Sequence, residues 1–445
     1  MTRGDARLKD HRAKPGTVGT NGHWTPDFGP RTPDPGLWTN DQRPLTNDHY
    51  MTKTEITRLE SIYRQGLLND TLPFWIDNAV DREFGGFTFM LDRDGSLMDT
   101  DKGVWQQGRF TWLMATLYNR WEQKPEWLNL AKHGIDFLEK HCFDTDGRMF
   151  FHIDQAGNPI RKRRYIFSET FAITAYAAYA KASGESWAGE KAIDIWKNIM
   201  HILHTPGALP PKFTAERPSK GLALPMTLLV TAQELRHNLG DHGFSDTIDT
   251  LLERIQLHWM KPEYSAILEN VGMNGEFIDH FDGRIMNPGH AIELAWFILR
   301  EGEYRNNDPK IIQLGLTILD WMWKWGWDEE FGGISYFKDL KNYPPQEYWH
   351  DMKFWWPQNE TIIATLMAYR LSGEKKYADM HKLIHDWTYK HFPDPEFGEW
   401  YGYLHRDGRI SVPSKGNLWK GPFHIPRMQM ICADECVKLL ESFKA

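Results

Sequence analysis

Two histidines in the sequence each stand three residues before a charged residue, a pattern that suits acid–base chemistry. His290 precedes Glu293 and His424 precedes Arg427, and residues three apart share one face of a helix. An imidazole has an ordinary pKa of about 6.5, so it gains or loses a proton near neutral pH. A metal site is the other use of such a cluster, but no His or Glu pair here has the spacing that gathers three ligands. We expect acid–base work without a metal, with Glu293 either raising the basicity of His290 or binding the ligand.

The histidines open two of the twelve helices that the apolar pattern predicts. Connections that follow odd-numbered helices are long, and those that follow even-numbered helices are short, such as Ser183-Gly-Glu185 and Ser372-Gly-Glu374. Apolar residues at helical spacing fall at 55–78, 106–122, 126–141, 168–183, 186–203, 224–239, 244–258, 288–302, 308–325, 356–372, 375–391 and 425–443.

The long connections carry a recurring element that predicts a β-hairpin. One copy runs from Asp81 to Gly95 and another from Asp394 to Gly408, with shorter copies that begin at Asp328 and Phe143. Glycine followed by an aromatic run and then Asp-Gly is typical of a strand that enters a tight turn. Six helix pairs of this kind predict an all-α (α/α)6 barrel with short β-hairpin insertions in the long loops. An open superhelix is the alternative, but its repeats would be shorter and would lack the hairpins.

Polar, charged or aromatic residues open five of the six even-numbered helices, which would form the inner ring. A helix at the centre of a barrel should be apolar, and these openings share one end, so they predict a single site where helix N-termini favour an oxyanion. One polar helix start alone would be only a cap, and the sixth helix opens plainly at Leu224-Pro-Met. The candidate site residues at or beside these openings are Trp105, Gln107, Arg109, Glu169, His290, Glu293, Lys353, Trp355, Glu360, His424 and Arg427.

Composition excludes several classes of protein. The net charge of -8 leaves no basic face for nucleic acid, and no run of apolar residues is long enough for a membrane span. Three cysteines are too few for a disulfide framework and favour a reducing compartment, so we predict a cytoplasmic protein. The 21 tryptophans are mostly core, but such a surplus also suits a site that stacks on a sugar ring. Phosphate-binding glycine loops and the Gly-x-Ser-x-Gly elbow are absent from the sequence.

Residues 1–50 differ from the rest of the chain. They contain six prolines, six glycines and no isoleucine, and such a segment buries too little surface to offset its ordering entropy. A helical pattern starts directly after Met51. We predict a disordered N-terminal extension over 1–50, followed by a single barrel domain over 51–445.

The chain resembles the N-acylglucosamine 2-epimerase family over about 70 to 427. Five blocks occur in the family's order, which makes the resemblance specific. They are Trp105-Gln-Gln-Gly-Arg109, Asn287-Pro-Gly-His-Ala-Ile-Glu293, Lys353-Phe-Trp-Trp-Pro-Gln-Asn-Glu360, Phe397-Gly-Glu-Trp-Tyr-Gly-Tyr403 and Trp419-Lys-Gly-Pro-Phe-His-Ile-Pro-Arg427. The last block is closer to the N-acyl branch of the family than to its disaccharide branch.

The resemblance implies an (α/α)6 barrel that interconverts N-acetyl-D-glucosamine and N-acetyl-D-mannosamine at C2 through a cis-enediolate. His290 and His424 match the family's two acid–base histidines, and Arg109 matches its enediolate-binding arginine. The matches to pocket residues are Glu293, Lys353, Glu360 and Arg427. The resemblance implies no cofactor for the chemistry, ATP as a possible allosteric activator, and a homodimer whose small-molecule partner is an amino sugar.

Three other functions remain open from the sequence. The first is epimerisation or isomerisation of another reducing sugar, as in the cellobiose 2-epimerases and mannose isomerases of the same family. The second is a glycosidase that uses Glu293 and Glu360 as its two carboxylates, although this leaves the histidines idle. The third is a non-catalytic protein-binding role, against which the intact set of Arg109, His290 and His424 argues.

Overall fold

The structure is a computed structural model that describes residues 50–163 and 165–444. The predicted N-terminal extension, apart from Tyr50, lies outside the described residues. The described residues group into one compact unit by their internal contacts. Within the described ranges, no helix combines the length and the apolar character that crossing a bilayer requires.

Twelve long helical segments run through the described residues, and each begins and ends within a few residues of its predicted bounds. The outer segments are α1 (Lys53–Gly66) with the π-turn Leu67–Thr71 and α2 (Leu72–Ala79), α4 (Pro125–His141), α6 (Ser186–His204), α8 (Phe244–His258), α11 (Pro309–Gly326) and α13 (Lys375–His391). The inner segments are α3 (Val104–Arg120), α5 (Phe167–Ser183), α7 (Ala223–Leu239), α10 (Pro288–Tyr304), α12 (Trp355–Ser372) and α14 (His424–Ser442).

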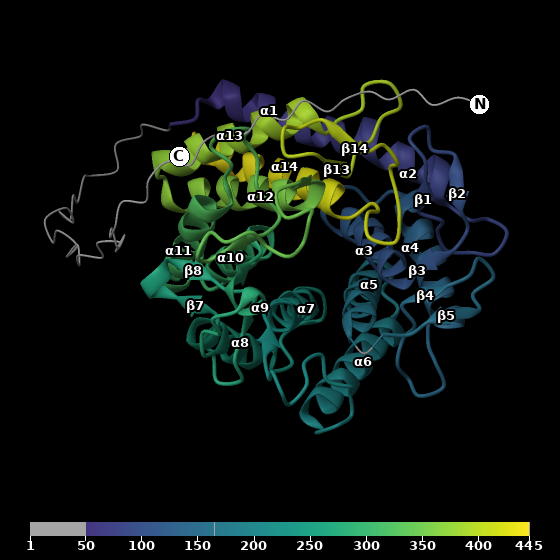
Figure 1. The fold of residues 1–445 in the computed structure, drawn as a ribbon. Helices are drawn as coiled ribbons and strands as arrows, with labels where there is room; N and C mark the ends of the chain where they lie inside the picture. Colours follow the sequence, from purple (N-terminus) through teal and green to yellow (C-terminus); the bar gives the residue numbers. More distant parts are fainter. Residues whose placement is uncertain (1–49, 164, 445) are drawn as a thin grey trace, which may run out of the picture. The chain divides into compact units, whose positions relative to one another are not determined.

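The inner helices form a ring in the order α3, α5, α7, α10, α12, α14, and each packs against an outer partner (Figure 1). Burial explains the two layers. Every residue of α12 from Trp355 to Tyr369 is buried, whereas α13 buries one stripe that includes Tyr377, His381 and Ile384. A helix that is buried all round belongs in the centre, and an amphipathic one covers it. The structure confirms the predicted (α/α)6 barrel.

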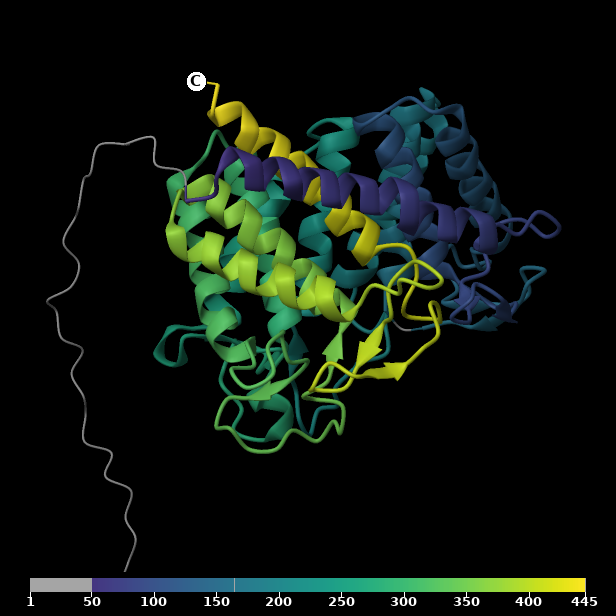
Figure 2. The ribbon, with the colours of Figure 1, turned by 90° about the horizontal axis from the view of Figure 1, so that it is seen from above.

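The ring closes where the first outer segment, α1, packs along the last helix, α14 (Figure 2). The start of α1 is well specified, because Thr52 and Glu55 form a capping box. The buried Met51 backbone N–H, next to this cap, donates to the Tyr369 hydroxyl at 3.0 Å. The helix therefore begins at the predicted position and ties the start of the described chain to α12.

Two of the short connections begin with a left-handed glycine that ends an inner helix. Gly184 follows α5 with φ of 76°, and Gly373 follows α12 with φ of 70°. A residue with a β-carbon is strained in this conformation, which is why glycine stands at both positions.

Short strands fill the long connections and join them to one another at one end of the barrel. Antiparallel pairs form within the predicted hairpins, as β1 with β2 and β13 with β14, and between connections, as β3 with β4 and β12 with β13. The strands are β1 (Met90–Leu91), β2 (Leu97–Asp99), β3 (Lys102–Gly103), β4 (His152–Ile153), β5 (Pro159–Arg161), β6 (Lys220–Gly221), β7 (Met260–Lys261), β8 (Ala266–Ile267), β9 (Asn270–Val271), β10 (Ile285–Met286), β11 (Lys338–Asp339), β12 (Lys353–Phe354), β13 (Tyr403–Leu404) and β14 (Ile410–Val412), with short helices at Pro262–Tyr264 and α9 (Phe281–Arg284).

Candidate active site

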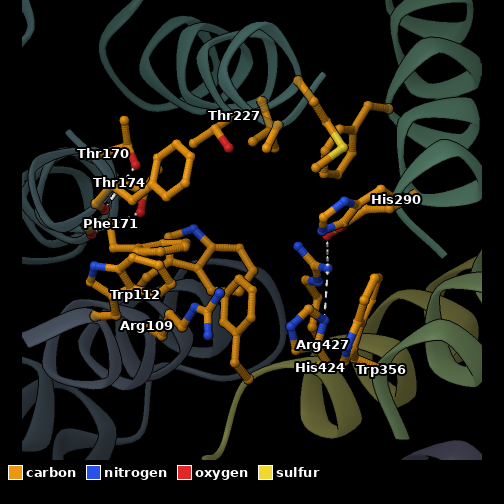
Figure 3. Close-up of a pocket in the computed structure, with 18 of the residues that line it drawn as sticks. Arg109, Trp112, Thr170, Phe171, Thr174, Thr227, His290, Trp356, His424 and Arg427 are labelled. Atoms are coloured by element: carbon orange, nitrogen blue, oxygen red, sulfur yellow. Dashed lines mark hydrogen bonds and ion pairs between the residues drawn. The ribbon is translucent and has the colours of Figure 1, made fainter. Parts of the chain in front are cut away.

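A cavity of about 650 Å³ lies inside the ring and opens among the long connections (Figure 3). All six inner helices contribute to its wall, because each starts at the same end and turns one face toward the axis. Its lining includes Trp105, Arg109, Trp112, Thr170, Phe171, Met226, Thr227, Val230, His290, Glu293, Phe297, Trp355, Trp356, Trp419, Phe423, His424, Arg427 and Ile431. The start of α7, which has no charged residue, thus supplies an uncharged part of the wall through Met226 and Thr227.

His424 stands at the start of α14 and is almost fully buried. Its Nδ1 lies 2.7 Å from Glu360 Oε1. The same carboxylate accepts from Trp296 Nε1 at 2.8 Å and pairs with Arg427 at 2.7 Å. Although burial raises the pKa of Glu360, three donors hold it as a carboxylate. Arg427 Nη2 also lies 3.3 Å from this Nδ1, but the shorter contact is to a carboxylate, which only accepts, so Nδ1 carries the hydrogen and Nε2 keeps a free lone pair.

His290 stands at the start of α10 and is partly accessible from the cavity. Its Nδ1 lies 3.1 Å from Oε2 of Glu269, in the connection between β8 and β9. The sequence led us to expect Glu293 either to raise the basicity of His290 or to bind the ligand. Glu269 is the carboxylate that the imidazole meets, and the charge of Glu293 adds a smaller contribution that also raises the pKa of His290. Glu269 was not among the candidates, and its only signal was a charged side chain between two short strands.

Glu293 pairs with Arg427 at 2.5 Å. The charged residues that follow the two histidines by three positions therefore contact each other, one from α10 and one from α14. Arg427 bridges Glu293 and Glu360, and its charge is favoured because both carboxylates raise its pKa against the opposing effect of burial. Ligand atoms of Glu293, Glu360 and His424 lie within 4.8 Å of one another, a spacing compatible with a metal ion. The Arg427 guanidinium already bonds both carboxylates, so a metal would have to displace it.

Arg109 projects from α3 into the cavity (Figure 3). Among the described residues it makes neither a hydrogen bond nor an ion pair, and its Nε is buried without a partner. Its guanidinium lies over the rings of Phe171 and Phe423, at 4.2 and 4.7 Å from their centroids. Burial and the nearby charge of Arg427 lower its pKa to about 9, which still leaves it charged at neutral pH. A charged fork without a protein anion is suited to an anion in the cavity.

The two histidines have opposite electrostatic surroundings. Burial lowers the pKa of His424 well below its ordinary value, and the positive charges of Arg427 and Arg109 add to this effect. Burial also acts on His290, but the Glu269 carboxylate outweighs it and raises the pKa above its ordinary value. Both imidazoles pack against the ring of Trp356, at 5.0 and 5.9 Å between centroids. The site thus brings to the same tryptophan one imidazole whose surroundings favour the neutral form and one whose surroundings favour the protonated form.

Trp356 was also not among the candidates, although its neighbour Trp355 was. Both side chains line the cavity, as does Trp105 on α3, which is separated from α12 by α14 in the ring. Two adjacent tryptophans give no sequence signal about which one meets the catalytic groups, because both are buried at a helix start. Trp419, 43% exposed, lies at 5.8 Å from Trp105 between centroids and adds an aromatic surface to the cavity.

Lys353 does not line the cavity. It is fully buried and donates to Asp328 at 2.9 Å and to the Gly333 carbonyl at 3.3 Å. Lys102 makes the same contacts with Asp81 and Gly85, and Lys415 makes them with Asp394 and Gly398. Lys353 therefore anchors one copy of the repeated hairpin to the start of the following inner helix. Two other copies of the hairpin have a lysine that contacts the equivalent aspartate.

Gln107 and Glu169 also hold hairpins, and neither lines the cavity. The Gln107 amide accepts from the Phe87 N–H and donates to the Phe87 carbonyl, at 2.9 and 2.8 Å. Glu169 accepts from the Met149 N–H at 3.0 Å and pairs with Arg148. A polar residue at the start of an inner helix thus has two uses in this barrel. One class faces the axis, and the other anchors the connection that leads into the helix.

Comparisons with known proteins identify the family and the fold. Residues 85–425 match the family N-acylglucosamine 2-epimerase (GlcNAc 2-epimerase). The N-acylglucosamine 2-epimerase of Rattus norvegicus is 34% identical over 388 residues, which cover 84% of this chain and 91% of that protein. The enzyme of Bos taurus is 34% identical over 381 residues, covering 84% and 90%.

A solved structure of cellobiose 2-epimerase from Spirochaeta thermophila shares the fold, with a TM-score of 0.75 at 20% identity over 86% of this chain and 98% of that one. The family match spans most of the chain, and the two mammalian relatives are matched over nearly their whole length. This protein belongs to the N-acylglucosamine 2-epimerase family.

Proposed function

We propose that this protein is a sugar 2-epimerase that interconverts N-acetyl-D-glucosamine and N-acetyl-D-mannosamine. One observation carries the proposal. Two histidines with opposite pKa shifts, His290 and His424, share one cavity with the unpaired cation of Arg109. The names of the relatives that are 34% identical support the choice of sugar.

The hydrogen-bond pattern gives each histidine a reactive nitrogen. In both cases Nδ1 faces a carboxylate, Glu269 for His290 and Glu360 for His424. A carboxylate only accepts, so the Nδ1 atom of each ring donates and Nε2 is left for the substrate. This arrangement fixes the tautomer of both bases before the sugar arrives.

The pKa difference assigns the first proton transfers. His424, whose neutral form is favoured, removes the C2 proton of the open-chain sugar, while His290, whose protonated form is favoured, supplies a proton to the other face of C2. Groups whose surroundings push their pKa values apart are the usual acid and base of such a pair. The reverse reaction starts from protonated His424 and neutral His290. After a forward turnover, His424 loses its proton to solvent and His290 gains one, which returns both rings to their starting states.

Arg109 stabilises the charge that develops on O1 when C2 loses its proton. The intermediate is of the cis-enediolate type, and its negative charge is new in the transition state. A buried guanidinium that no protein anion neutralises is most effective at this point, since water does not screen it. Because Arg427 is held by Glu293 and Glu360, Arg109 is the cation available for O1.

The alternative glycosidase reading fits the site less well. A glycosidase needs one carboxylic acid free to protonate the leaving group and a second carboxylate at a set distance. Here Glu293 and Glu360 both bind Arg427, and Glu360 also bonds His424 and Trp296. Neither carboxyl group is left to give a proton.

Three finer expectations belong to the same proposal. ATP would act as an activator and not as a reactant, since no step above uses it, and we assign it no residues. The protein would work as a homodimer in the cytoplasm. The support for these points is the resemblance to the N-acyl branch and, for the compartment, three cysteines that are all free and buried.

The test is to incubate the purified protein with N-acetylmannosamine in deuterated water, with and without ATP, and to follow C2 by NMR. Formation of N-acetylglucosamine with deuterium at C2 is the expected result. Cellobiose and mannose serve as parallel substrates. Turnover of cellobiose or mannose without turnover of N-acetylmannosamine would contradict the assigned sugar. Release of a monosaccharide from an oligosaccharide would support the glycosidase function instead.

A further inference from the structure

The last copy of the repeated hairpin has a glutamate where two earlier copies have glycine. In these three copies the N–H of the first aspartate donates to the carbonyl of the fifth residue after it, at 3.0 or 3.1 Å. That fifth residue is Gly86, Gly333 and Glu399, with φ of 66°, 73° and 57° in the same order. A residue with a β-carbon is strained in this left-handed conformation. The last copy therefore contains backbone strain that glycine would avoid.

The side chain of Glu399 explains why glycine is absent from this position. Glu399 and Lys420 are both fully buried, and Lys420 Nζ donates to Glu399 Oε1 at 2.7 Å. Lys420 Nζ also donates to the Lys415 carbonyl at 2.8 Å. Within the described part of the chain, Glu399 is the carboxylate that pairs with Lys420. A buried ammonium group without a counter-charge is strongly destabilising, so Lys420 depends on Glu399.

Three inner helices have a lysine seven residues before a charged residue of the site. The lysines are Lys102, Lys353 and Lys420, and the site residues are Arg109, Glu360 and Arg427 in the same order. The first two lysines bind the aspartate of a hairpin. In the last copy Lys415 binds the aspartate. Lys420 therefore needs a different carboxylate, and Glu399 supplies it.

The backbone supports the starts of these three helices differently. Helices α3 and α12 begin directly after β3 and β12, which are both paired strands. Helix α14 begins after residues 413–423, none of which lies in a strand. We call residues 416–423 the approach segment. Its first part is held by backbone bonds, because the N–H groups of Lys415 and Gly416 donate to the Leu91 carbonyl at 3.0 and 3.1 Å.

Side chains hold the later part of the approach segment. Gln106 Nε2 donates to the Trp419 carbonyl at 2.8 Å, and the Lys420 side chain reaches Glu399. Lys420 is the last of these anchors before α14. The position of the helix start therefore depends on the ion pair between Glu399 and Lys420.

The approach segment supplies part of the cavity wall and leads into the proposed base. Trp419 and Phe423 line the cavity, and His424 follows directly. The Phe423 ring lies 4.7 Å from the Arg109 guanidinium and 4.4 Å from that of Arg427, measured to the ring centroid. A displacement of this segment would move His424 and the ring on which both cations pack.

We infer that Glu399 is a positioning residue of the active site, which fixes the approach segment through Lys420 and so places Phe423 and His424. This inference rests on the proposed function, in which His424 is the base. Neither Glu399 nor Lys420 lines the cavity, so the pair acts through the segment and not on the sugar. Glycine at position 399 would fit the backbone but would leave Lys420 without its counter-charge.

The experiment compares kcat and KM for N-acetylmannosamine, per folded protein, in the wild type, Glu399→Gly and Glu399→Gln. Glu399→Gly should fold, because two other copies have glycine at this position. Its kcat should fall by about 10²-fold, the effect of a displacement of about 1 Å at the catalytic groups, and KM should change much less. Glu399→Gln should keep most of the kcat, since its amide oxygen still accepts from Lys420.

Lys420→Met and Lys102→Met form a matched pair, because each removes the lysine that stands seven residues before a site arginine. Lys420→Met should lower kcat as Glu399→Gly does. Lys102→Met should lower only the melting temperature, since the pairing of β3 with β4 still holds its helix start. Amide hydrogen exchange over residues 416–423, read by mass spectrometry, should be faster in Glu399→Gly and Lys420→Met but not in Lys102→Met.

The exchange measurement separates this inference from the proposed function. A folded Glu399→Gly protein with wild-type kcat, or with exchange over 416–423 as slow as in the wild type, would overturn the positioning role. A change in KM alone would connect the pair to Trp419 and overturn its link to His424. A wild type that turns over no N-acetyl sugar would overturn the proposed function, and exchange would then decide whether Glu399 holds the segment.

Discussion

His290 and His424 occupy equivalent places at the starts of two inner helices, yet their surroundings differ. His424 lies among cations and is almost sealed from solvent, whereas His290 pairs with Glu269 and is partly open to the cavity. The first arrangement favours the neutral ring and the second favours the protonated ring. One scaffold position, repeated around the ring, can therefore carry a base in one copy and an acid in another.

The carboxylates next to the two histidines explain why the pKa of His424 is lowered while that of His290 is raised. Glu360 is fixed by Trp296 and Arg427 as well as by His424, so its charge is shared among three donors. Among the described side chains, Glu269 has only His290 as a hydrogen-bond partner. A carboxylate that serves one histidine stabilises its charge more than a carboxylate that also serves an arginine.

Removal of either imidazole should have the largest effect on the reaction. We expect His290→Ala and His424→Ala each to lower the rate of epimerisation by at least about 10²-fold, the lower bound for a positioned acid or base. Initial rates from both epimers, with melting curves to confirm folding, measure this. A variant that keeps more than a tenth of the wild-type rate would remove that histidine from the mechanism.

Arg109→Lys should come next, with a loss of about 10²–10³-fold in kcat, as for one oxyanion donor. A lysine ammonium keeps the charge but not the planar fork. KM should change much less than kcat, because the charge on O1 develops only in the transition state. The competing reading is that Arg109 only supports α3. A folded Arg109→Lys protein with normal kcat and weaker substrate binding would favour that reading.

Glu269→Gln should bring the pKa values of the two histidines closer together. In the wild type, kcat/KM should fall on the acid side only when His424 is protonated, well below its ordinary pKa, and on the alkaline side when His290 loses its proton. Without the Glu269 charge, burial lowers the pKa of His290, so the alkaline limb moves to lower pH. The loss should grow by roughly tenfold per pH unit above the new limb. A pH profile with an unmoved alkaline limb would show that His290 is not the acid.

Lys353→Met should change the chemistry least. Lys353 holds a hairpin through Asp328 and does not line the cavity. We expect a loss of about 3 kcal/mol in stability, as for a broken buried ion pair, and kcat/KM close to that of the wild type. Lys415→Met, the equivalent change in another copy of the hairpin, is the control and should behave alike. A selective loss of sugar binding in Lys353→Met alone would place Lys353 in the site.

The sequence predicted the barrel because its signals are periodic and repeated. Inner helices must be apolar all round and outer ones on one face, and glycines such as Gly184 mark the short turns. The positions of His290 and His424 were also predictable, since a histidine at the start of a buried helix is unusual. Their partners were not predictable. Helical spacing shows which residues share a face, but Glu269 arrives from a loop that only the tertiary structure brings near.

The hairpin anchors show a second limit of the sequence. Lys353, Gln107 and Glu169 look like site residues because they are polar and open buried helices. Their side chains turn toward the preceding hairpin and satisfy its backbone or its aspartate. A buried polar group needs partners wherever it points. Polarity at a helix start therefore does not distinguish the cavity from the hairpin layer.

The central claim is that each histidine serves one face of C2, and isotope exchange in the two alanine variants tests it most directly. Each variant is incubated with each N-acetyl epimer in deuterated water, and loss of the C2 proton is followed by NMR. The account predicts a complementary pattern, in which His290→Ala exchanges the C2 proton of one epimer through His424, and His424→Ala exchanges that of the other through His290. Exchange of the same epimer by both variants would contradict it.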